Sequence, residues 1–377
     1  MAIDRRNFIR QASIAVGAFP LAAATDFKTI KIIDKALPNF AAPRIKIGVI
    51  GINHSHIYGM ARSVIRGGAE LVSFYAKEDD LAAAFTKAFP NAKRAKEEKE
   101  VLEDSSIQMI LSAAIPNERA PIAIRAMLHG KDAMLDKPGI TDLKQLKEIK
   151  KIQKQTGKIV SISYSERFEN RSSEKAGQLI AEGAIGKVIQ TTGMGPHRMN
   201  APSRPSWFFD KQYYGGIITD IASHQFDQFL FYTGSTSAKI VGSQTGNFHH
   251  PQYPLFEDFG DVIVAGDKGS GYIRVDWFTP GGVKPFGDGR LFILGTEGYM
   301  ELRKYTDIGR KEEGSFLYLV NQKEAIVMDC SDVELTYGHK LVDDVVNRTQ
   351  TAMGQDHCFL AMELALLAQK KAQAIGL

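Results

Sequence analysis

The sequence predicts an α/β protein in two parts: a doubly wound parallel sheet, followed by an α+β domain built on a large, mostly antiparallel sheet. Three observations support this prediction. Up to about residue 160, short apolar runs alternate with helical stretches, which is typical of a doubly wound sheet. From residue 161 onward, longer β-rich runs joined by Gly-rich turns dominate. The length of 377 residues corresponds to about two domains.

The first part, residues 44–160, opens with an apolar run over 45–50 that ends at Gly51, as expected for a buried parallel strand. Further strands are expected over 71–75, 107–114 and 133–135, and helices over 55–66, 81–89 and 116–129 and from Leu143 onward. The last helix is amphipathic, because apolar residues recur every three positions between Lys and Glu. Gly157 lies where its C-cap would fall.

The second part, residues 161–377, is expected to carry the antiparallel sheet. One helix is predicted over 172–182, ending at Gly183, another over 220–233, and a C-terminal helix over 355–375. Strands are predicted over 188–193, 240–245, 261–265, 271–278, 290–294, 299–303 and 316–320. A long sheet with an uncovered face would leave apolar surface that association can bury, so we expect a homo-oligomer, either a dimer or a tetramer.

The N-terminal residues 1–24 predict an export signal. The pair Arg5-Arg6 precedes an Ala-rich, mildly apolar stretch that ends in three alanines, Ala22 to Ala24, and this order resembles a twin-arginine signal peptide. The alternative is an amphipathic N-terminal helix of the mature fold. Residues 25–43, which contain Pro38 and Pro43, are then a leader or linker. We therefore expect a periplasmic protein, or one otherwise exported by the twin-arginine route.

Composition excludes several classes of protein. The chain carries 47 basic and 43 acidic residues, a net charge of +4, which is weak for nucleic-acid binding and comes without a dense basic patch. The sequence contains no stretch of about 18 uncharged apolar residues, so no membrane span is expected. Two cysteines, Cys330 and Cys358, exclude a disulfide scaffold and a multi-cysteine metal site, although whether they pair is left open.

The turn after the first strand carries a variant of a dinucleotide-binding motif. Such a turn uses three glycines, for a tight turn, for close approach to the pyrophosphate, and for helix–strand packing. Gly51 occupies the first place, whereas Asn53 and His56 occupy the second and third, with His54 and Ser55 between them. After the second strand, Ala76 occupies the expected place of a ribose-binding acid. The nearest acids are Glu78 and Asp79, while Lys77 would suit a 2′-phosphate, so both NAD and NADP remain possible.

The dipeptide Asp136-Lys137 follows the apolar strand 133–135 and precedes Pro138. Proline favours an extended residue before it, which would leave the Lys137 ammonium at the carboxyl edge of the parallel sheet, where ligands of such sheets bind. The alternative is an ordinary solvated lysine before a turn.

A third group of polar residues begins after Gly215-Gly216. On a helix, Asp220, His224 and Asp227 would share one face. A carboxylate beside an imidazole can orient a hydroxyl group and exchange its proton. The alternative is that Asp220 caps the helix and that His224 is a satisfied, half-buried histidine.

Together these motifs resemble the glucose–fructose oxidoreductase and inositol dehydrogenase family (Gfo/Idh/MocA), over about residues 44–377. The resemblance implies an N-terminal Rossmann domain, with NAD as the first choice of cofactor and NADP as the second. It makes Lys137 and His224 the catalytic pair and Asp220 a substrate-positioning residue, and Pro116-Asn117 resembles the family's Pro-Asn after the fourth strand. The expected cofactor-binding residues are Gly51, Asn53, His54, Ser55, His56, Lys77, Pro116, Asn117, Asp136 and Lys137.

The resemblance therefore predicts an exported NAD(P)-dependent oxidoreductase that acts on a secondary hydroxyl of a sugar, glycoside or polyol. Two alternatives are an NAD-dependent glycosidase, which works by transient oxidation and elimination, and a non-catalytic sugar-binding or scaffold protein with a degraded nucleotide site. On the substrate side we expect His197, Arg198 and Trp207 beside Asp220 and His224. No metal is expected, because neither His54 and His56 nor His249 and His250 have a matching pattern of carboxylates or thiolates in the sequence.

Overall fold

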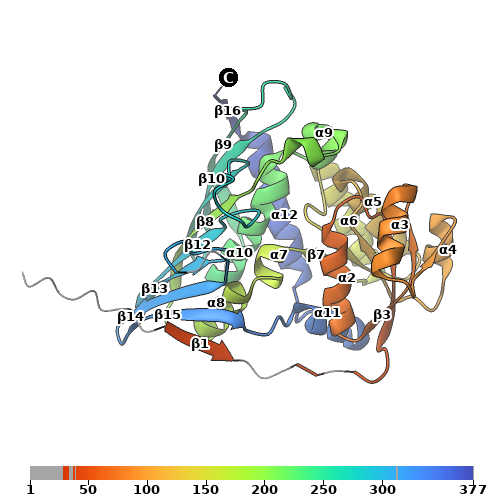
Figure 1. Cartoon of the computed structure of the whole chain (residues 1–377), viewed down its shortest axis with the longest axis horizontal. Coiled ribbons are helices and arrows are strands. Elements are labelled where there is room, and N and C mark those ends of the chain that lie inside the picture. The colour runs from red at the N-terminus through yellow and green to blue at the C-terminus, as the bar shows by residue number, and fades with distance from the viewer. Residues whose placement is uncertain (1–28, 34–36, 39, 311–312, 377) are drawn as a thin grey trace, which may run out of the picture.

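The computed structural model describes residues 29–33, 37–38, 40–310 and 313–376. The predicted signal, residues 1–24, lies outside the described residues. Two sheets with helices between and around them make up the described chain (Figure 1). None of its described helices is both long and apolar enough to span a bilayer.

The first sheet is parallel throughout and has six strands in the order β4 (Lys93–Arg94), β3 (Ala69–Tyr75), β2 (Ile45–Ile50), β5 (Met109–Ser112), β6 (Asp132–Asp136) and β7 (Val160–Ser163). This confirms the predicted doubly wound sheet. The strand order reverses between β2 and β5, and ligands of open α/β sheets bind outside the carboxyl ends of the strands at such a point.

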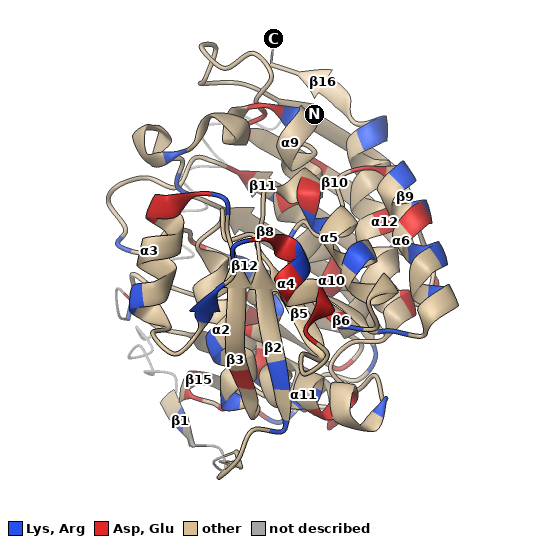
Figure 2. Ribbon diagram, turned by 90° about the vertical axis from the view of Figure 1, so that its right-hand side faces the viewer, with Lys and Arg blue, Asp and Glu red and all other residues tan. Residues whose placement is uncertain are grey.

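Helices cover both faces of this sheet. In Figure 2, α2 (His56–Arg66) and α3 (Asp79–Ala88) lie on one side of β2 and β3, and α5 (Pro116–Leu128) and α6 (Leu143–Thr156) lie on the other. The short helix α4 (Glu98–Glu103) packs on the strands as well. Side chains of β2 pack into two separate apolar clusters, one on each face of the sheet. Ile47 and Val49 belong to one cluster and Ile50 to the other, because successive side chains of a strand point to opposite faces.

The second sheet has ten strands in the order β1 (Thr29–Ile33), β15 (Ala325–Asp332), β14 (Phe316–Asn321), β13 (Gly298–Arg303), β12 (Arg290–Gly295), β8 (Val188–Pro196), β11 (Ser270–Asp276), β10 (Phe259–Gly266), β9 (Ala238–Gly246) and β16 (Gln373–Ile375). Neighbours are antiparallel except for three pairs, β1–β15, β8–β11 and β9–β16. The prediction of a large, mostly antiparallel sheet is therefore confirmed.

Described residues cover only one face of the large sheet. Helices α8 (Arg171–Ala181), α10 (Ser223–Thr233) and α12 (Gln355–Lys371) lie between it and the parallel sheet (Figure 1). The opposite face, here called the outer face, exposes large apolar side chains that alternate with buried ones along the strands. Its exposed members are Ile189, Val241, Ile263, Phe292, Leu294 and Tyr299.

Several boundaries differ from those expected. Strand β7 continues the parallel sheet beyond residue 160, and strand β1 lies inside the stretch 25–43 that was expected to be a leader or linker. The C-terminal helix ends at Lys371, not at Ile375, because residues 373–375 leave it and pair with β9. Strand β15 and helix α11 (Tyr337–Asn347), which packs against α2, were not predicted. Cys330 and Cys358 are both buried and are not joined by a disulfide.

Candidate active site

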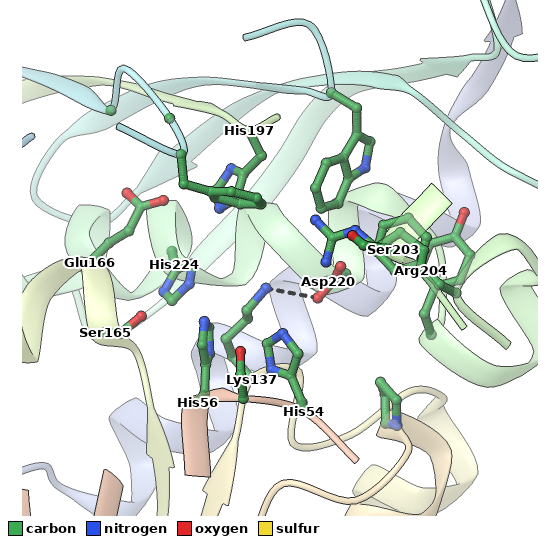
Figure 3. Close-up of a pocket in the computed structure, with 18 of the residues that line it drawn as sticks. His54, His56, Lys137, Ser165, Glu166, His197, Ser203, Arg204, Asp220 and His224 are labelled. Atoms are coloured by element: carbon green, nitrogen blue, oxygen red, sulfur yellow. Dashed lines mark hydrogen bonds and ion pairs between the residues drawn. The ribbon is translucent and has the colours of Figure 1, made fainter. Parts of the chain in front are cut away.

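Two adjoining cavities open at the carboxyl edge of the parallel sheet and share Asn53 in their walls. The larger, of about 530 Å³, lies between the two domains and is here called the central cavity (Figure 3). The smaller, of about 280 Å³, is here called the nucleotide cavity. It is lined by Gly51, Ala76, Lys77 and Glu78, which follow β2 and β3, and by Asn117 at the start of α5. Both lie at the switch point of the sheet, where a dinucleotide-binding domain holds its ligand.

The first position of the first βα turn, Gly51, has the backbone conformation that the tight turn of a dinucleotide-binding motif needs. Gly51 has a φ of +79°, and a Cβ atom there would meet the Cβ of Ala114 at 2.4 Å, so only glycine fits. Helix α2 begins five residues later at His56, which places a helix N-terminus at the cavity edge. The side-chain amide of Asn53 donates to Oε1 of Glu78 at 2.8 Å, which draws it toward β3. The described residues therefore fit a dinucleotide, and Glu78 is an acid that lines the nucleotide cavity just after β3.

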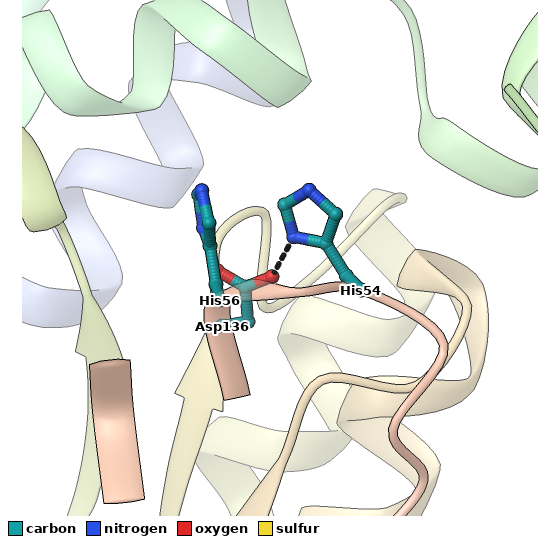
Figure 4. A group of neighbouring side chains, drawn as sticks. All are labelled: His54, His56 and Asp136. Carbon is teal, nitrogen blue, oxygen red and sulfur yellow. Dashed lines mark hydrogen bonds and ion pairs between the residues drawn. The ribbon is translucent and has the colours of Figure 1, made fainter. Parts of the chain in front are cut away.

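Asp136 is fully buried at the end of β6 and holds two imidazoles at the base of the central cavity (Figure 4). Its Oδ2 accepts from Nδ1 of His54 at 2.6 Å, and its Oδ1 accepts from Nδ1 of His56 at 2.9 Å. A carboxylate only accepts, so each Nδ1 carries a proton and donates it to Asp136. Burial alone would raise the pKa of Asp136, but Arg119, 3.1 Å away, and the two histidines hold that pKa well below its usual value.

His54, His56 and Asp136 form a group that could in principle hold a metal ion, although the sequence showed no carboxylate in a matching pattern. No carboxylate follows the His54–His56 pattern along the chain, yet the fold brings Asp136 within reach of both rings. The carboxylate is already engaged, because it also accepts from the backbone N–H of Lys137 at 2.8 Å and pairs with the Arg119 guanidinium. The geometry therefore fits an anchor for two oriented imidazoles, and we assign no metal to it.

Lys137 projects from the end of β6 into the central cavity and meets a residue of the other domain. Its Nζ donates to Oδ1 of Asp220 at 3.0 Å, and both side chains are nearly buried. Asp220 lies on a π-helical turn, Ile218–Ala222, which leads into α10. Such turns often occur at functional sites because they displace a side chain from the regular helical surface. Asp220 thus faces Lys137 and does not cap the helix.

His224 lies in the first turn of α10 and lines the same cavity. Burial is the main cause that lowers the pKa of His224 to about 3. The Glu166 charge raises this pKa and the Lys137 charge lowers it. The ring is therefore neutral near pH 7. Its Nδ1 is buried and has no hydrogen-bond partner among the described residues. His197, at the end of β8, is also neutral, because burial and Lys137 lower its pKa to about 4.

A buried network supports the opposite end of the cavity from Asp220 (Figure 3). Glu166 follows β7, and its Oε2 accepts from Nζ of Lys304 at 2.6 Å and from Nε2 of Gln225 at 2.8 Å. Burial raises the pKa of Glu166, but Lys304 and nearby histidines outweigh burial and bring it to about 2. Glu166 is therefore ionised, and its hydrogen bonds hold it in a fixed position in the wall of the cavity.

The structure brings most of the predicted site residues together. The central cavity is lined by Asn53, His54, Ser55, His56, Pro116, Lys137, His197, Trp207, Asp220 and His224. The nucleotide cavity is lined by Gly51, Asn53, Lys77 and Asn117. Asp136 lies behind His54 and His56 and lines neither cavity.

Two residues of the sequence motifs face elsewhere. The Arg198 guanidinium donates to backbone carbonyls of a loop, among them Pro280 at 3.1 Å and Pro285 at 3.2 Å, and lines neither cavity. It follows His197 directly in extended chain, where successive side chains point in opposite directions. Asp227 is buried in an ion pair with Arg167 at 2.6 Å, away from the cavity.

The sequence interpretation missed several residues of the central cavity. Arg119, Glu166, Arg204, Trp277, Phe286 and Tyr305 all line it. Glu166 could have been found, because it follows a strand of the parallel sheet at the edge where ligands bind. Arg204 stands three residues before the predicted Trp207, in a segment whose aromatic residues suggest a face for a sugar ring. The others come from loops or a helix interior and show no local pattern.

A Rossmann domain with a paired lysine and a neutral histidine at its cleft defines a nicotinamide-dependent oxidoreductase. Comparisons with known proteins agree: residues 45–164 match the model of an oxidoreductase family with an NAD-binding Rossmann fold, and residues 173–301 match the GFO/IDH/MocA C-terminal domain. This chain belongs to the GFO/IDH/MocA family of oxidoreductases, and its N-terminal domain is the NAD-binding domain of that family.

Individual relatives cover most of the chain. It is 27% identical over 263 residues to the NAD-dependent scyllo-inositol 2-dehydrogenase of Bacillus subtilis, an alignment that covers 68% of this chain and 72% of the relative. A solved structure from Erwinia carotovora atroseptica, described only as an oxidoreductase, is 44% identical with a TM-score of 0.85 and covers 88% of this chain and 99% of its own. A levoglucosan dehydrogenase bound to NADH and levoglucosan shares the fold at 16% identity and a TM-score of 0.73, covering 87% and 98%.

Proposed function

We propose that this protein is a dehydrogenase that transfers hydride between NAD(P) and the carbon bearing a secondary hydroxyl of a sugar, glycoside or polyol. One observation carries the proposal: the Lys137–Asp220 pair and the neutral His224 line a single cavity that adjoins the nucleotide cavity. The name of the Bacillus subtilis relative, an inositol dehydrogenase, supports a polyhydroxylated substrate.

Each side chain has a distinct task in this reaction. Asp220 compensates the Lys137 ammonium and aims it, so Lys137 donates a hydrogen bond to the reacting oxygen. His224 is neutral and lies in the same wall, so it accepts the hydroxyl proton and returns it when a ketone is reduced. The bound dinucleotide supplies the hydride acceptor or donor. Nδ1 of His224 has no hydrogen-bond partner among the described residues, so no contact there fixes which ring nitrogen carries the proton.

For the cofactor we favour NAD over NADP. The Glu78 carboxylate lines the nucleotide cavity and would repel a 2′-phosphate, whereas it can accept from the ribose hydroxyls of NAD. Calorimetric titration with NAD(H) and NADP(H) tests this directly. A folded protein that binds none of the four would favour the non-catalytic sugar-binding or scaffold alternative.

The reaction itself is tested by following NADH absorbance with a panel of inositols, free sugars and glycosides. Net NADH formation that depends on Lys137 supports a dehydrogenase. Release of aglycone from glycosides without net NADH would instead indicate the glycosidase alternative, in which hydride returns after elimination.

We also propose export through the twin-arginine pathway. Its support is the Arg5-Arg6 pair followed by the Ala-rich stretch that ends at Ala24. This route carries folded proteins, so the dinucleotide would be bound before translocation. Replacement of both arginines by lysine should trap the precursor in the cytoplasm, and unchanged delivery in a strain without the twin-arginine translocase would contradict export.

A further inference from the structure

The charges that line the central cavity do not cancel. Three of its ionised side chains are compensated by a close partner: Arg119 by Asp136 at 3.1 Å, Lys137 by Asp220 at 3.0 Å, and Glu166 by Lys304 at 2.6 Å. Arg204 is the exception. Within the part of the chain that the structure describes, no carboxylate lies within ion-pair distance of its guanidinium. Asp220 also attracts the Arg204 charge, but this carboxylate is already paired with Lys137, so the cavity carries one positive charge without a carboxylate of its own.

The protein holds the Arg204 guanidinium in a fixed orientation. Its Nε donates to the carbonyl of Met199 at 3.0 Å, and its Nη2 donates to the carbonyl of Arg198 at 3.3 Å. Its carbon lies over three aromatic rings, 4.5 Å from the centre of Phe208, 5.2 Å from Trp277 and 5.4 Å from Phe286. These contacts restrict the long side chain, so little conformational entropy remains to be lost when a ligand binds.

The free edge of this guanidinium matches a carboxylate. A guanidinium has five N–H donors, and the two backbone carbonyls use one on Nε and one on Nη2. Both hydrogens of Nη1 and one of Nη2 remain, and this edge presents the two parallel donors that a carboxylate accepts. Figure 3 shows Arg204 beside Asp220, at the opposite end of the cavity from Glu166.

We propose that Arg204 anchors a carboxylate and that the substrate is a sugar acid, such as a hexuronate or its glycoside. The inference rests on the proposed function, since it names the substrate class of the same cavity. The neutral imidazoles of His197 and His224 suit the hydroxyl groups of the sugar, and the aromatic side chains suit its apolar faces. A cofactor phosphate is the other source of such an anion, but Arg204 does not line the nucleotide cavity.

The test measures binding of matched acidic and neutral sugars to the full protein loaded with NADH, by calorimetry. We expect D-glucuronate or D-galacturonate to bind about 10- to 100-fold more tightly than D-glucose or D-galactose, the range of a hydrogen bond to a charged group. Arg204→Met should abolish this preference, whereas Arg204→Lys, which keeps the charge and loses the fork, should retain part of it. The Kd of NADH should not change in either variant.

A control variant removes a positive charge from elsewhere. Lys150, on the exposed side of α6, pairs with Glu363, so Lys150→Met should leave the preference intact. Equal affinity of the wild-type protein for acids and neutral sugars would overturn the inference even if the Arg204 variants failed to fold. Weaker NADH binding in Arg204→Met would overturn it as well, because Arg204 would then serve the cofactor.

The same experiment separates this inference from the proposed function. If sugars are oxidised but Arg204→Met has no effect on the binding or turnover of the acidic sugars, the dehydrogenase stands and the carboxylate anchor is wrong. If NADH binds but none of the sugars, acidic or neutral, binds or is oxidised, the proposed function fails together with the anchor.

Discussion

At the scale of single residues, the site depends on buried charges that, apart from Arg204, are matched by a specific partner. Asp136 orients His54 and His56 from below, Asp220 aims Lys137 from the other domain, and Glu166 is fixed by Lys304. Removing one member of such a pair leaves the other charge buried and uncompensated, which costs far more than an exposed pair gains. The effect of a substitution here should therefore be judged by what it leaves unpaired.

The first prediction concerns Lys137 and His224. Lys137→Ala and His224→Ala should each lower kcat by about 10²–10⁴-fold, the usual contribution of a general acid–base group, while dinucleotide binding survives. Because the proposed mechanism has both residues act on one oxygen, the double variant should be little worse than the poorer single variant. Steady-state kinetics with the substrate found by the panel, combined with NADH titration, measures both effects. Near-wild-type turnover in both single variants would remove these residues from the mechanism.

The second prediction is that acid destabilises the fold through three histidines. Burial is the first cause that lowers the pKa of His54 and His197 to about 4 and of His224 to about 3. In the unfolded chain these histidines have an ordinary pKa of about 6.5. Below that pH the unfolded chain therefore binds more protons than the folded chain. The free energy of unfolding should be highest above pH 6.5 and fall as the pH drops toward 4, by at most about 1.4 kcal/mol per pH unit for each histidine.

Urea unfolding at several pH values between 7.5 and 4.5 measures this slope. His224→Gln removes one of the three groups and should reduce the slope, whatever it does to the stability at pH 7.5. A slope that is unchanged in this variant would mean that His224 has no depressed pKa.

Much of the residue-level site could be predicted because strand ends in a parallel sheet converge on one edge. That rule led to Lys137 and the Gly51–His56 turn, and the Gly-Gly segment led to Asp220 and His224. Arg204 and Tyr305 could not be predicted in this way, since only the tertiary fold brings their loops to the cavity. The same holds for Asp136 as the partner of two histidines 80 and 82 residues away.

At the scale of elements, the π-helical turn Ile218–Ala222 decides where Asp220 points. The chain enters it through Gly215 and Gly216, whose φ values are +86° and +94°. Gln369 of α12 braces it, because its Oε1 accepts from the backbone N–H of Ile218 at 2.9 Å and its Nε2 donates to Glu257 at 3.0 Å. The expected regular helix over 220–233 therefore begins one turn later than the polar pattern indicated.

The third prediction tests this turn with Gly216→Ala. A Cβ atom at residue 216 would meet the Gln369 side chain at 2.3 Å, and the backbone conformation disfavours any residue but glycine. We expect a loss of about 1–3 kcal/mol in the free energy of unfolding, together with lower activity because Asp220 shifts. The matched control is Asp142→Ala, which removes the N-cap that accepts from Lys144 and Gln145 at the start of α6.

The control should lose stability without losing activity. Removal of a helix cap costs about 0.5–2 kcal/mol, and Asp142 lines neither cavity. Chemical denaturation and kinetics on both variants separate the two effects. If Gly216→Ala lowered stability but left activity unchanged, the turn would not position Asp220.

Elements with a clear period were predicted, and elements without one were not. The parallel strands are continuous apolar runs and α6 is amphipathic, so both stand out in the sequence. Strand β15 interrupts its apolar residues with Asp329 and Ser331, and α11 mixes charged and apolar residues over a short length. Their positions are set by pairing with β14 and packing on α2, which no local window contains.

At the scale of the whole molecule, the outer face of the large sheet is the main surface without an internal partner among the described residues. Its exposed apolar side chains come from five strands, β8, β9, β10, β12 and β13, that lie side by side in the sheet or one strand apart. Contiguous apolar surface of this kind usually marks an association site. A closed two-fold dimer would bury the same face of both copies.

The fourth prediction is therefore a homodimer formed through the outer face. Val241 is 60% exposed on β9 and Ile263 is 50% exposed on β10, so the double variant Val241→Lys/Ile263→Lys should shift the protein to monomer. Leu128, 56% exposed on α5, offers a matched control, and Leu128→Lys should leave the dimer intact. Light scattering at micromolar concentration measures the mass. A wild-type monomer, or a dimer that survives the double variant, would contradict this interface.

The two ends of the large sheet have a practical consequence for handling the protein. Strand β1, near the start of the described chain, closes one edge against β15, and strand β16, at residues 373–375, closes the other against β9. Each terminal strand shields backbone donors and acceptors that would otherwise recruit a strand from another molecule. Ending the chain before Gln373, or removing residues 29–33 together with the proposed signal, would expose the unpaired backbone groups of β9 or of β15. Versions of the protein that keep both strands should stay in solution at concentrations where shortened versions precipitate.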